Sequence, residues 1–272
     1  TFVFAIGALF FVYIPQPEIS EAGREGTGNL WQESAYGFRY IFAHRSLLGL
    51  QLVFTIGNFF ATLGLTLLAP MILARTGNNE MVLGTVQSAG AVGGVVGGLL
   101  MSSTGGLRRR IHGVLAGWIL GSLFGEALLG LGQSLPVWIV ASFIFAFFVP
   151  LINASNQSIW QSKVMPDVQG RVFSVRRMIA IVVVPIAQLL AGPLADQVFE
   201  PAMMPGGNLV PVFGSLVGVG PGGGMALILV IVGLLAASTG LIGYAVRTIR
   251  NVEDLLPDHD AVAEGVKGRA PA

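Results

Sequence analysis

Two acidic side chains in long apolar segments are the residues best placed to do chemistry in this sequence. Glu126 is the only acidic residue well inside such a segment, and Asp196 lies at the end of another. Burial disfavours the charged form of a carboxylate, so a carboxylate in an apolar segment can carry a proton. Both residues are therefore candidates for proton coupling, and Ser122, one turn before Glu126, is its expected hydrogen-bond partner. The alternatives are a structural role for Glu126 and an interfacial position for Asp196.

Amide, hydroxyl and aromatic side chains recur in four of the apolar segments. Three follow i, i+3, i+7 spacing in one segment and three follow i, i+3, i+4 spacing in another, so each set shares a helix face. We expect a mostly apolar cavity with scattered amides, which suits bulky amphiphilic small molecules. The alternative is hydrogen bonding between helices of a static bundle, or an inner gate for the group that begins at Asn153. The candidate cavity residues are Thr55, Asn58, Thr62, Gln87, Phe145, Phe148, Asn153, Asn156, Gln157 and Gln188.

The scarcity of other reactive side chains excludes several classes of protein. Cysteine is absent, and the three histidines are far apart in the sequence, so neither thiolate chemistry nor a His-rich metal site is expected. Catalytic residues are too sparse for an enzyme embedded in a membrane, and no cofactor is expected. The net charge of +1 weighs against a nucleic-acid partner. No filter-like loop or charged ring indicates a channel.

The elements that must position these residues are membrane-spanning helices. The sequence is 53% hydrophobic and 11% charged, whereas a soluble domain carries about 25% charged residues. A spanning helix needs about 20 mainly apolar residues. Six segments meet this requirement, namely 47–74, 81–103, 111–132, 136–160, 174–198 and 223–246. We therefore predict an all-α integral membrane protein with the lipid bilayer as a partner.

A seventh apolar run, Phe2 to Ile14, has 13 residues and begins where the sequence begins. It lacks the basic start and the small-residue cleavage site of a signal peptide. We interpret it as the end of a longer spanning helix.

The distribution of basic residues predicts the orientation of the helices. Fourteen of the fifteen Lys and Arg residues lie in alternate connections and in the tail, and Arg75 alone lies on the other side. Because basic residues are retained on the cytoplasmic side, this asymmetry predicts six complete crossings with the C-terminus in the cytoplasm. We expect the basic clusters Arg108–Arg110 and Arg176–Arg177 to be topology anchors and contacts for anionic lipids, with a role in gating as the alternative.

The connections and the glycines have further patterns of their own. In 15–46, Phe38, Ile41 and Phe42 fall on one helix face, which predicts a short interfacial helix before the first complete span. The Gly- and Pro-rich segment 199–222 predicts an external loop that folds back on the membrane, and the tail is expected to be disordered past Pro257. Glycines spaced by four in 81–103 and 111–132 predict close helix contacts.

Several motifs resemble one superfamily of membrane transporters. The loop that contains Gly98, Gly105 and Arg108–Arg110 is similar to the loop motif of the major facilitator superfamily, although Ser102 stands at the motif's acidic position. The stretch from Trp160 to Arg177 resembles the macrolide- and siderophore-efflux branch, as does Ala191 to Asp196. The residues of the cytoplasmic loop motif or gate are Gly98, Ser102, Gly105, Arg108, Arg109, Arg110, Asp167 and Arg171.

The resemblance implies a C-terminal six-helix half of an alternating-access carrier, with an N-terminal half as its partner. It implies that 47–74, 81–103, 136–160 and 174–198 line the cavity, while 111–132 and 223–246 face lipid. The expected domains are the end of the preceding half (1–14), a cytoplasmic central linker (15–46), the transmembrane domain (47–249) and a cytoplasmic tail (250–272).

The expected function is efflux of amphiphilic small molecules such as drugs, macrolides or siderophores, coupled to protons. The expected location is the plasma membrane, the inner membrane of a bacterium. The alternative is a structural or degenerate half-transporter without independent transport.

Overall fold

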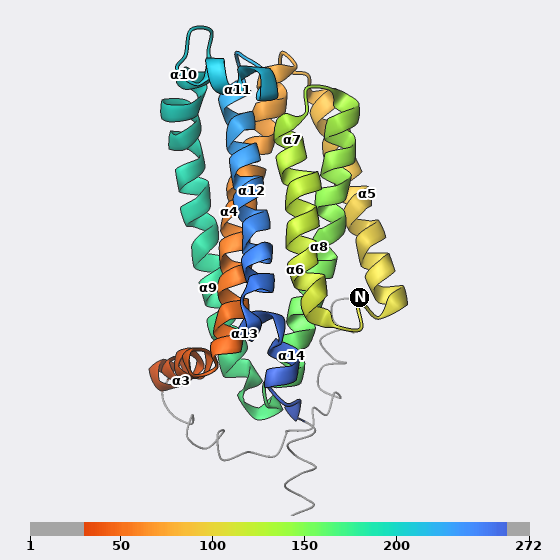
Figure 1. Cartoon of the computed structure of the whole chain (residues 1–272), viewed down its shortest axis with the longest axis vertical. Coiled ribbons are helices and arrows are strands. Elements are labelled where there is room, and N and C mark those ends of the chain that lie inside the picture. Colours follow the sequence, from red (N-terminus) through yellow and green to blue (C-terminus); the bar gives the residue numbers. More distant parts are fainter. Residues whose placement is uncertain (1–29, 260–272) are drawn as a thin grey trace, which may run out of the picture.

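The computed structural model describes residues 30–259, which form helices and contain no strand (Figure 1). Within this range, six helices are long and apolar enough to cross a membrane, so the predicted fold class is confirmed. The expected end of a preceding helix at 1–14 lies outside the described residues. The long helices are α4 (Arg45–Arg75), α5 (Glu80–Thr104), α6 (Arg110–Gly121), α8 (Leu135–Lys163), α9 (Pro166–Pro193) and α12 (Gly223–Ala245).

Two of the spans contain a π-helical turn that lengthens them. The helix α6 continues through η1 (Ser122–Ala127) and α7 (Leu128–Leu131). The helix α9 continues through η2 (Leu194–Phe199) and α10 (Glu200–Met203). A π turn inside an α-helix is rare and occurs frequently at functional sites.

The span predicted at 174–198 begins two turns earlier in the structure. The first turns of α9 bury Val168, Val172 and Val175 among polar residues, so they are amphipathic rather than uniformly apolar. A search for apolar runs therefore misses them, although they pack against the short helix α3 (Leu30–Ala43).

The helix α3 lies across the foot of the bundle and not along the long helices (Figure 1). Gly37 allows the crossing, because a Cβ atom there would lie 2.6 Å from Val175 Cγ2. The helix is thus where the pattern predicts one, but its buried face includes Tyr36 and Ile41, whereas Phe42 is exposed. The predicted apolar face is therefore only partly the packed face. Its position at a membrane surface stays a prediction.

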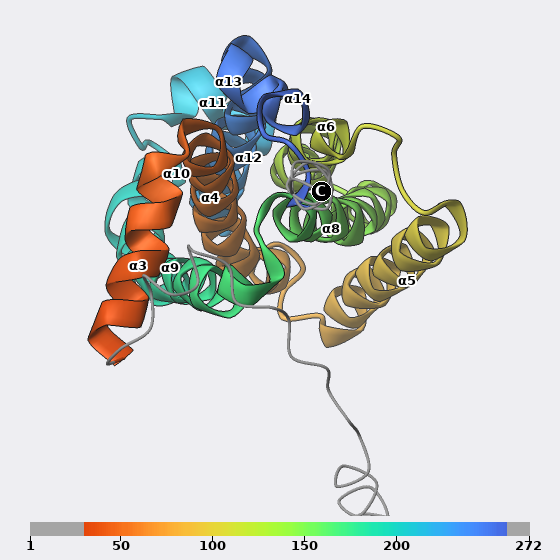
Figure 2. The ribbon, with the colours of Figure 1, turned by 90° about the horizontal axis from the view of Figure 1, so that it is seen from below.

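In the view along the bundle, α5 and α9 lie at opposite sides, and the other long helices lie between them (Figure 2). The helix α5 packs along α8 at one side, and α9 packs along α4 at the other. At Gly93 and Gly97 of α5, a Cβ atom would collide with the backbone oxygens of Phe143 and Phe147 on α8. The glycine spacing thus permits the close contact that it predicts.

The helices α6 and α12 are the most deeply buried of the six spans. About 61% and 67% of their most apolar windows are buried within the chain, against 17–39% in the other four spans. The expectation that these two spans face lipid is therefore wrong for much of their surface. The physical reason is that α12 packs against both α4 and α6, while α6 packs against α8.

The end of the bundle that carries α11 (Val210–Val217), here called the α11 end, is held together by Arg75. Its Nη1 donates to the Gly132 carbonyl at 3.0 Å and its Nε to the Gly222 carbonyl at 3.3 Å, while Nη2 donates to the Val217 carbonyl. One side chain thus joins the end of α4 to two connections that are distant in sequence, one at Gly132 and one that contains Val217 and Gly222. The predicted external loop 199–222 is accordingly an ordered cap that contains α10 and α11.

A glutamate completes the α11 end. The Glu200 carboxylate accepts from the backbone N–H groups of Gly222 at 3.1 Å and Met225 at 2.8 Å, at the start of α12. A carboxylate is favourable there because the first N–H groups of a helix lack partners within it and its dipole is positive at that end.

The opposite end of the bundle, here called the α3 end, is closed by α13 (Arg247–Arg250) and α14 (Val252–Leu255). The Lys163 ammonium group donates to the carbonyls of Glu253 at 2.6 Å and Leu256 at 2.5 Å, and it pairs with Asp258 at 2.8 Å. The part of the tail that the structure describes, up to His259, is therefore docked against the bundle. The predicted disorder past Pro257 falls almost entirely on residues outside the described range.

A second glutamate caps a helix at the α3 end. The Glu253 carboxylate accepts from the backbone N–H groups of Arg110 at 3.3 Å and Ile111 at 3.0 Å, at the start of α6. Arg109 pairs with Asp254 at 3.4 Å nearby. The two ends of the bundle thus use the same device, a basic side chain on backbone carbonyls and a glutamate on a helix N-terminus.

Candidate functional site

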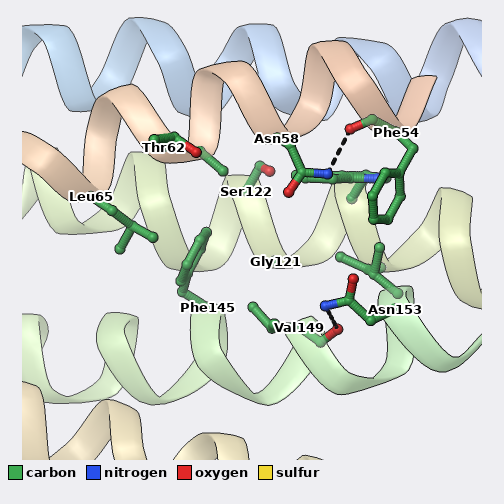
Figure 3. A pocket seen from close by; sticks show the side chains of 13 residues that line it. Phe54, Asn58, Thr62, Leu65, Gly121, Ser122, Phe145, Val149 and Asn153 are labelled. Carbon is green, nitrogen blue, oxygen red and sulfur yellow. Dashed lines mark hydrogen bonds between the residues drawn. The ribbon is translucent and has the colours of Figure 1, made fainter. Parts of the chain in front are cut away.

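A pocket lies midway along the bundle between α4, α6 with η1, and α8, here called the central pocket (Figure 3). Its volume is about 140 Å³. Aromatic and amide side chains mix in its wall, as the sequence predicts for a mostly apolar cavity. Among the residues that line it are Phe54, Asn58, Thr62, Trp118, Ser122, Phe145 and Asn153.

The amides of the central pocket bond to their own helices and not across to neighbouring ones. Asn58 Nδ2 donates to the Phe54 carbonyl at 2.7 Å, and Asn153 Nδ2 donates to the Val149 carbonyl at 3.0 Å (Figure 3). In an apolar helix, amides that only tie a static bundle together would bond between helices. The observed bonds leave the amide oxygens at the pocket wall, where they can accept from a bound molecule.

The wall contributed by α6 is the part of this pocket that sequence reasoning missed. Gly117, Trp118, Gly121 and Ser122 line the pocket, although the resemblance assigned this span to lipid. The signal was present in the glycine spacing, because a Cβ atom at Gly117 would lie 2.5 Å from Ile152 Cγ1 of α8. A helix with such a stripe is built to approach a neighbour closely.

A second pocket, here called the basic pocket, lies nearer the α3 end between α4, α8 and α9. Its volume is about 420 Å³, and it shares Phe54 and Asn153 with the central pocket. Most of its lining residues are polar or charged. They are Gln51, Phe54, Asn153, Asn156, Gln157, Phe173, Arg176, Arg177 and Ala180.

A network of side chains joins the three helices of the basic pocket. Arg176 Nε donates to Gln51 Oε1 and its Nη1 to Gln157 Oε1, both at 3.4 Å. Gln51 Nε2 in turn donates to Thr55 Oγ1 at 3.2 Å. The structure thus brings predicted residues of α4 and α8 together around Arg176. The sequence predicts for this arginine a topology anchor and lipid contact, or a gating role, but no place in a pocket.

Four predicted cavity residues lie outside both pockets. Thr55 is half-buried on α4, where its hydroxyl accepts from Gln51 Nε2. Gln87 and Gln188 are exposed on the flanking helices α5 and α9. Phe148 is half-buried and packs edge-on against Phe147, with the ring centroids 5.3 Å apart. None of these four residues belongs to the lining of the central or the basic pocket.

The candidate carboxylates have contrasting surroundings. Glu126 is 1% exposed within the π-helical turn η1 and packs so closely on α4 that a Cβ atom at Gly64 would collide with its carboxylate. Within residues 30–259, neither of its oxygens nor the Ser122 hydroxyl has a hydrogen-bond partner. The expected bond between these two residues is therefore not formed. Asp196 is exposed in η2.

The predicted loop motif lies at the α3 end, and its members differ in what they do. Gly105 ends α5 in the left-handed region, with φ of 68°, which favours glycine. Ser102 Oγ donates to the Gly98 carbonyl on its own helix at 2.9 Å, and Arg108 is exposed.

The basic side chains of this motif contact neighbouring segments. Arg110 Nη1 donates to the Ser158 carbonyl at 3.2 Å, while Arg109 reaches Asp254 in α14. Arg171 lies 5.9 Å from the ring centre of Tyr36 in α3, and Asp167 also makes an interaction. These contacts join connections and short helices to the bundle. A role in gating stays a prediction.

The chain is thus a multi-pass helical membrane protein with two joined pockets and a buried carboxylate. Among the described residues, no three acidic or histidine side chains gather as metal ligands would. Such an arrangement can bind and orient a molecule within the membrane, and it offers one group that could carry a proton.

Comparison with curated proteins finds a distant likeness to macrolide efflux protein A. The chain is 24% identical over 200 residues to this protein from Streptococcus pyogenes, and equally to its counterpart from Streptococcus pyogenes serotype M6. The matched region covers 71% of the chain and 48% of each relative, so the chain spans about half the length of these relatives. No family model and no solved structure matches the chain.

Proposed function

We propose that the chain is the C-terminal half of a major facilitator superfamily carrier that exports amphiphilic small molecules. The observation that carries this proposal is the pair of joined pockets between α4, α6, α8 and α9. Their walls combine aromatic surface with a few amides, which suits ligands that need much apolar contact and little polar orientation. The distant likeness to a macrolide efflux protein supports the same function.

The incomplete pocket wall supports an N-terminal half as the partner. Leu65 and Val149 line the central pocket yet are exposed in this chain. Exposed apolar side chains also cover the flanking helices, including Val95 and Leu99 on α5 and Leu189 on α9. A second six-helix bundle that faces these helices would close the pockets, and alternating access would follow from rocking of one half on the other.

The charge distribution supports a plasma-membrane protein with its C-terminus in the cytoplasm. The described basic clusters lie in the connections of the α3 end. Among the described residues, Arg75 is the one basic side chain at the α11 end, where it bonds to Val217 of α11. Under the positive-inside rule, the α3 end is cytoplasmic. For coupling, Glu126 is the stronger candidate, because it is buried without a partner in the described chain whereas Asp196 is exposed.

The test is accumulation of a radiolabelled macrolide in cells that express the complete gene. We expect expression to lower accumulation, and we expect a protonophore to abolish the difference. Asn58→Leu should lower export at least fivefold because it replaces an amide of the central pocket, whereas Gln188→Leu, the same kind of change outside both pockets, should leave export within twofold.

Two outcomes would contradict this function. Equal accumulation with and without the gene, across a broad panel of amphiphilic compounds, would favour a structural half-transporter. Equal loss in the Asn58 and Gln188 variants would show that the pocket does not carry the export. Expression of residues 1–272 alone gives a further comparison, since a half that exports without a partner would contradict the two-half mechanism.

A further inference from the structure

The guanidinium group of Arg176 lies at the wall of the basic pocket, where side chains of α4, α8 and α9 hold it in place. Its Cζ atom lies 4.2 Å from the ring centre of Trp160 and 5.3 Å from that of Phe173. Its bonds to Gln51 and Gln157 hold it from the sides. Stacking on aromatic rings and a planar set of donors make a guanidinium a pre-organised binding group.

This charge has no anionic partner in the described chain. Neither the ion pair of Arg109 with Asp254 nor that of Lys163 with Asp258 includes Arg176. The oxygens that it does contact belong to neutral amides, and its Nη2 makes no hydrogen bond there. A cation inside a membrane span is costly unless it pairs with an anion or reaches water. Arg176 is half-buried at the wall of the basic pocket, so an anion that enters this pocket meets a guanidinium group without an ion-pair partner in the described chain.

The surroundings of Arg176 have room and further polar groups for such a partner. The basic pocket has a volume of about 420 Å³ and includes Arg177, which adds a second positive charge. Asn156 also lines this pocket, is 2% exposed, and has an amide oxygen without a partner among the described residues. Since the amide can be turned, it can present either its oxygen or its NH₂ group.

The basic pocket continues into the mostly apolar central pocket. Phe54 and Asn153 belong to both pockets, so the basic pocket continues into the central pocket with its Trp118 and Phe145 walls. Along α4 the two pockets extend from Gln51 to Leu65, which is about 20 Å at the rise of an α-helix. A molecule with a charged head and an apolar body of that length fits this order of groups.

We propose that the basic pocket binds the anionic group of an amphiphile, a carboxylate, sulfonate or phosphate, whose apolar body occupies the central pocket. Arg176 supplies the main charge, Arg177 adds to the positive field, and the amides of Asn156 and Gln157 orient the head. The inference rests on the proposed function in that it adds anionic amphiphiles to the substrates of the same pockets, beside the macrolide of the transport test. Binding is nevertheless measured without transport, so the two can fail separately.

The test compares a fluorescent acid with its neutral ester. The probe is 11-(dansylamino)undecanoic acid, and the control ligand is its methyl ester, both titrated into the purified protein in nanodiscs of phosphatidylcholine. We expect the wild-type protein to bind the acid more tightly. Arg176→Gln should weaken acid binding about tenfold or more, as loss of a charge-assisted hydrogen bond implies, while ester binding stays within twofold.

Matched variants separate the pocket from general charge and from misfolding. Arg108→Gln makes the same change at an exposed loop position, and we expect acid binding within twofold of wild type. Arg176→Lys keeps the charge but loses the planar donors, so a partial loss is expected. Decanoate should displace the probe from the wild-type protein at a lower concentration than decanol, which tests the site even if Arg176→Gln fails to fold.

A lipid arm identifies the source of the anion. If nanodiscs with phosphatidylglycerol weaken acid binding to the wild type but not to Arg176→Gln, the site takes a lipid headgroup; if they leave it unchanged, the site takes a free amphiphile. Equal affinity for acid and ester in the wild type would overturn the proposal, as would equal losses in Arg176→Gln and Arg108→Gln. Acid binding through Arg176 in a protein that does not export would keep the site and reject the transport function.

Discussion

The two ends of the bundle and its middle treat polar groups in opposite ways. At the α11 end, Arg75 and Glu200 bond to backbone groups of distant connections. At the α3 end, Lys163 and Glu253 do the same. In the middle, the carboxylate of Glu126 is buried with no partner in the described chain.

This difference indicates which polar residues stabilise the fold and which are available for binding and transport. A buried polar group that is hydrogen-bonded repays its lost hydration, whereas an unpaired one lowers the stability of the folded state. Proteins most often break this rule at functional sites. The ends should therefore control the stability of the bundle, and the middle should control binding and transport.

The largest expected loss of stability is at the α3 end. The Lys163 side chain is 3% exposed and has three partners. Lys163→Met removes two short charge-assisted hydrogen bonds and an ion pair, so we expect the free energy of unfolding to fall by about 3 kcal/mol. Thermal unfolding of the purified protein measures this loss, and limited proteolysis should show earlier cleavage after residue 246.

The control for this prediction is Arg108→Met, which removes a charge from an exposed position at the same end. It should change the unfolding temperature little. If both variants lose equal stability, then general charge at the α3 end and not the docked tail stabilises the bundle.

A smaller loss is expected at the α11 end. Arg75 is half-buried, and water can replace part of what its three carbonyl partners lose. Arg75→Met should therefore lower the free energy of unfolding by about 2 kcal/mol. Hydrogen exchange should rise at residues 217–222 and around Gly132. Exchange that rises equally in the α3 end would contradict the view that the two ends act separately.

The sequence predicts the helices well because apolar length and basic loops are local properties. It fails where a contact depends on distant segments. Arg75 is visible as the one basic residue on its side, yet nothing local shows that residues 132, 217 and 222 converge on it. The sequence likewise predicts Arg176 as a topology anchor or gate residue and not as part of a pocket, because its neighbours Trp160 and Gln51 come from two other helices.

The pocket residues also show that a local sequence pattern cannot predict contacts with distant segments. Helical spacing correctly groups Asn153, Asn156 and Gln157, which all line the basic pocket. It cannot tell which face of α5 or α9 turns inward, and Gln87 and Gln188 are exposed. For α6, the glycine stripe was a better guide to its packing than the resemblance that assigned it to lipid.

The smallest expected change in stability is at Glu126, where the comparison predicts the largest change in transport. Glu126→Gln keeps the shape of the side chain and removes no hydrogen bond, since the carboxylate has no partner among residues 30–259. We expect the free energy of unfolding to change by less than about 1 kcal/mol. A carboxamide cannot release a proton, so proton-driven export should fall at least tenfold if Glu126 carries the proton.

Glu80→Gln, the same change at an exposed position in the first turn of α5, should leave both export and stability unchanged. Thermal unfolding and macrolide accumulation measured on the same three proteins decide the matter. Suppose that the Glu126 variant unfolds as easily as Lys163→Met but still exports. Then this carboxylate stabilises the fold as the polar residues of the α3 and α11 ends do, and the contrast between stabilising ends and a middle that transports would be wrong.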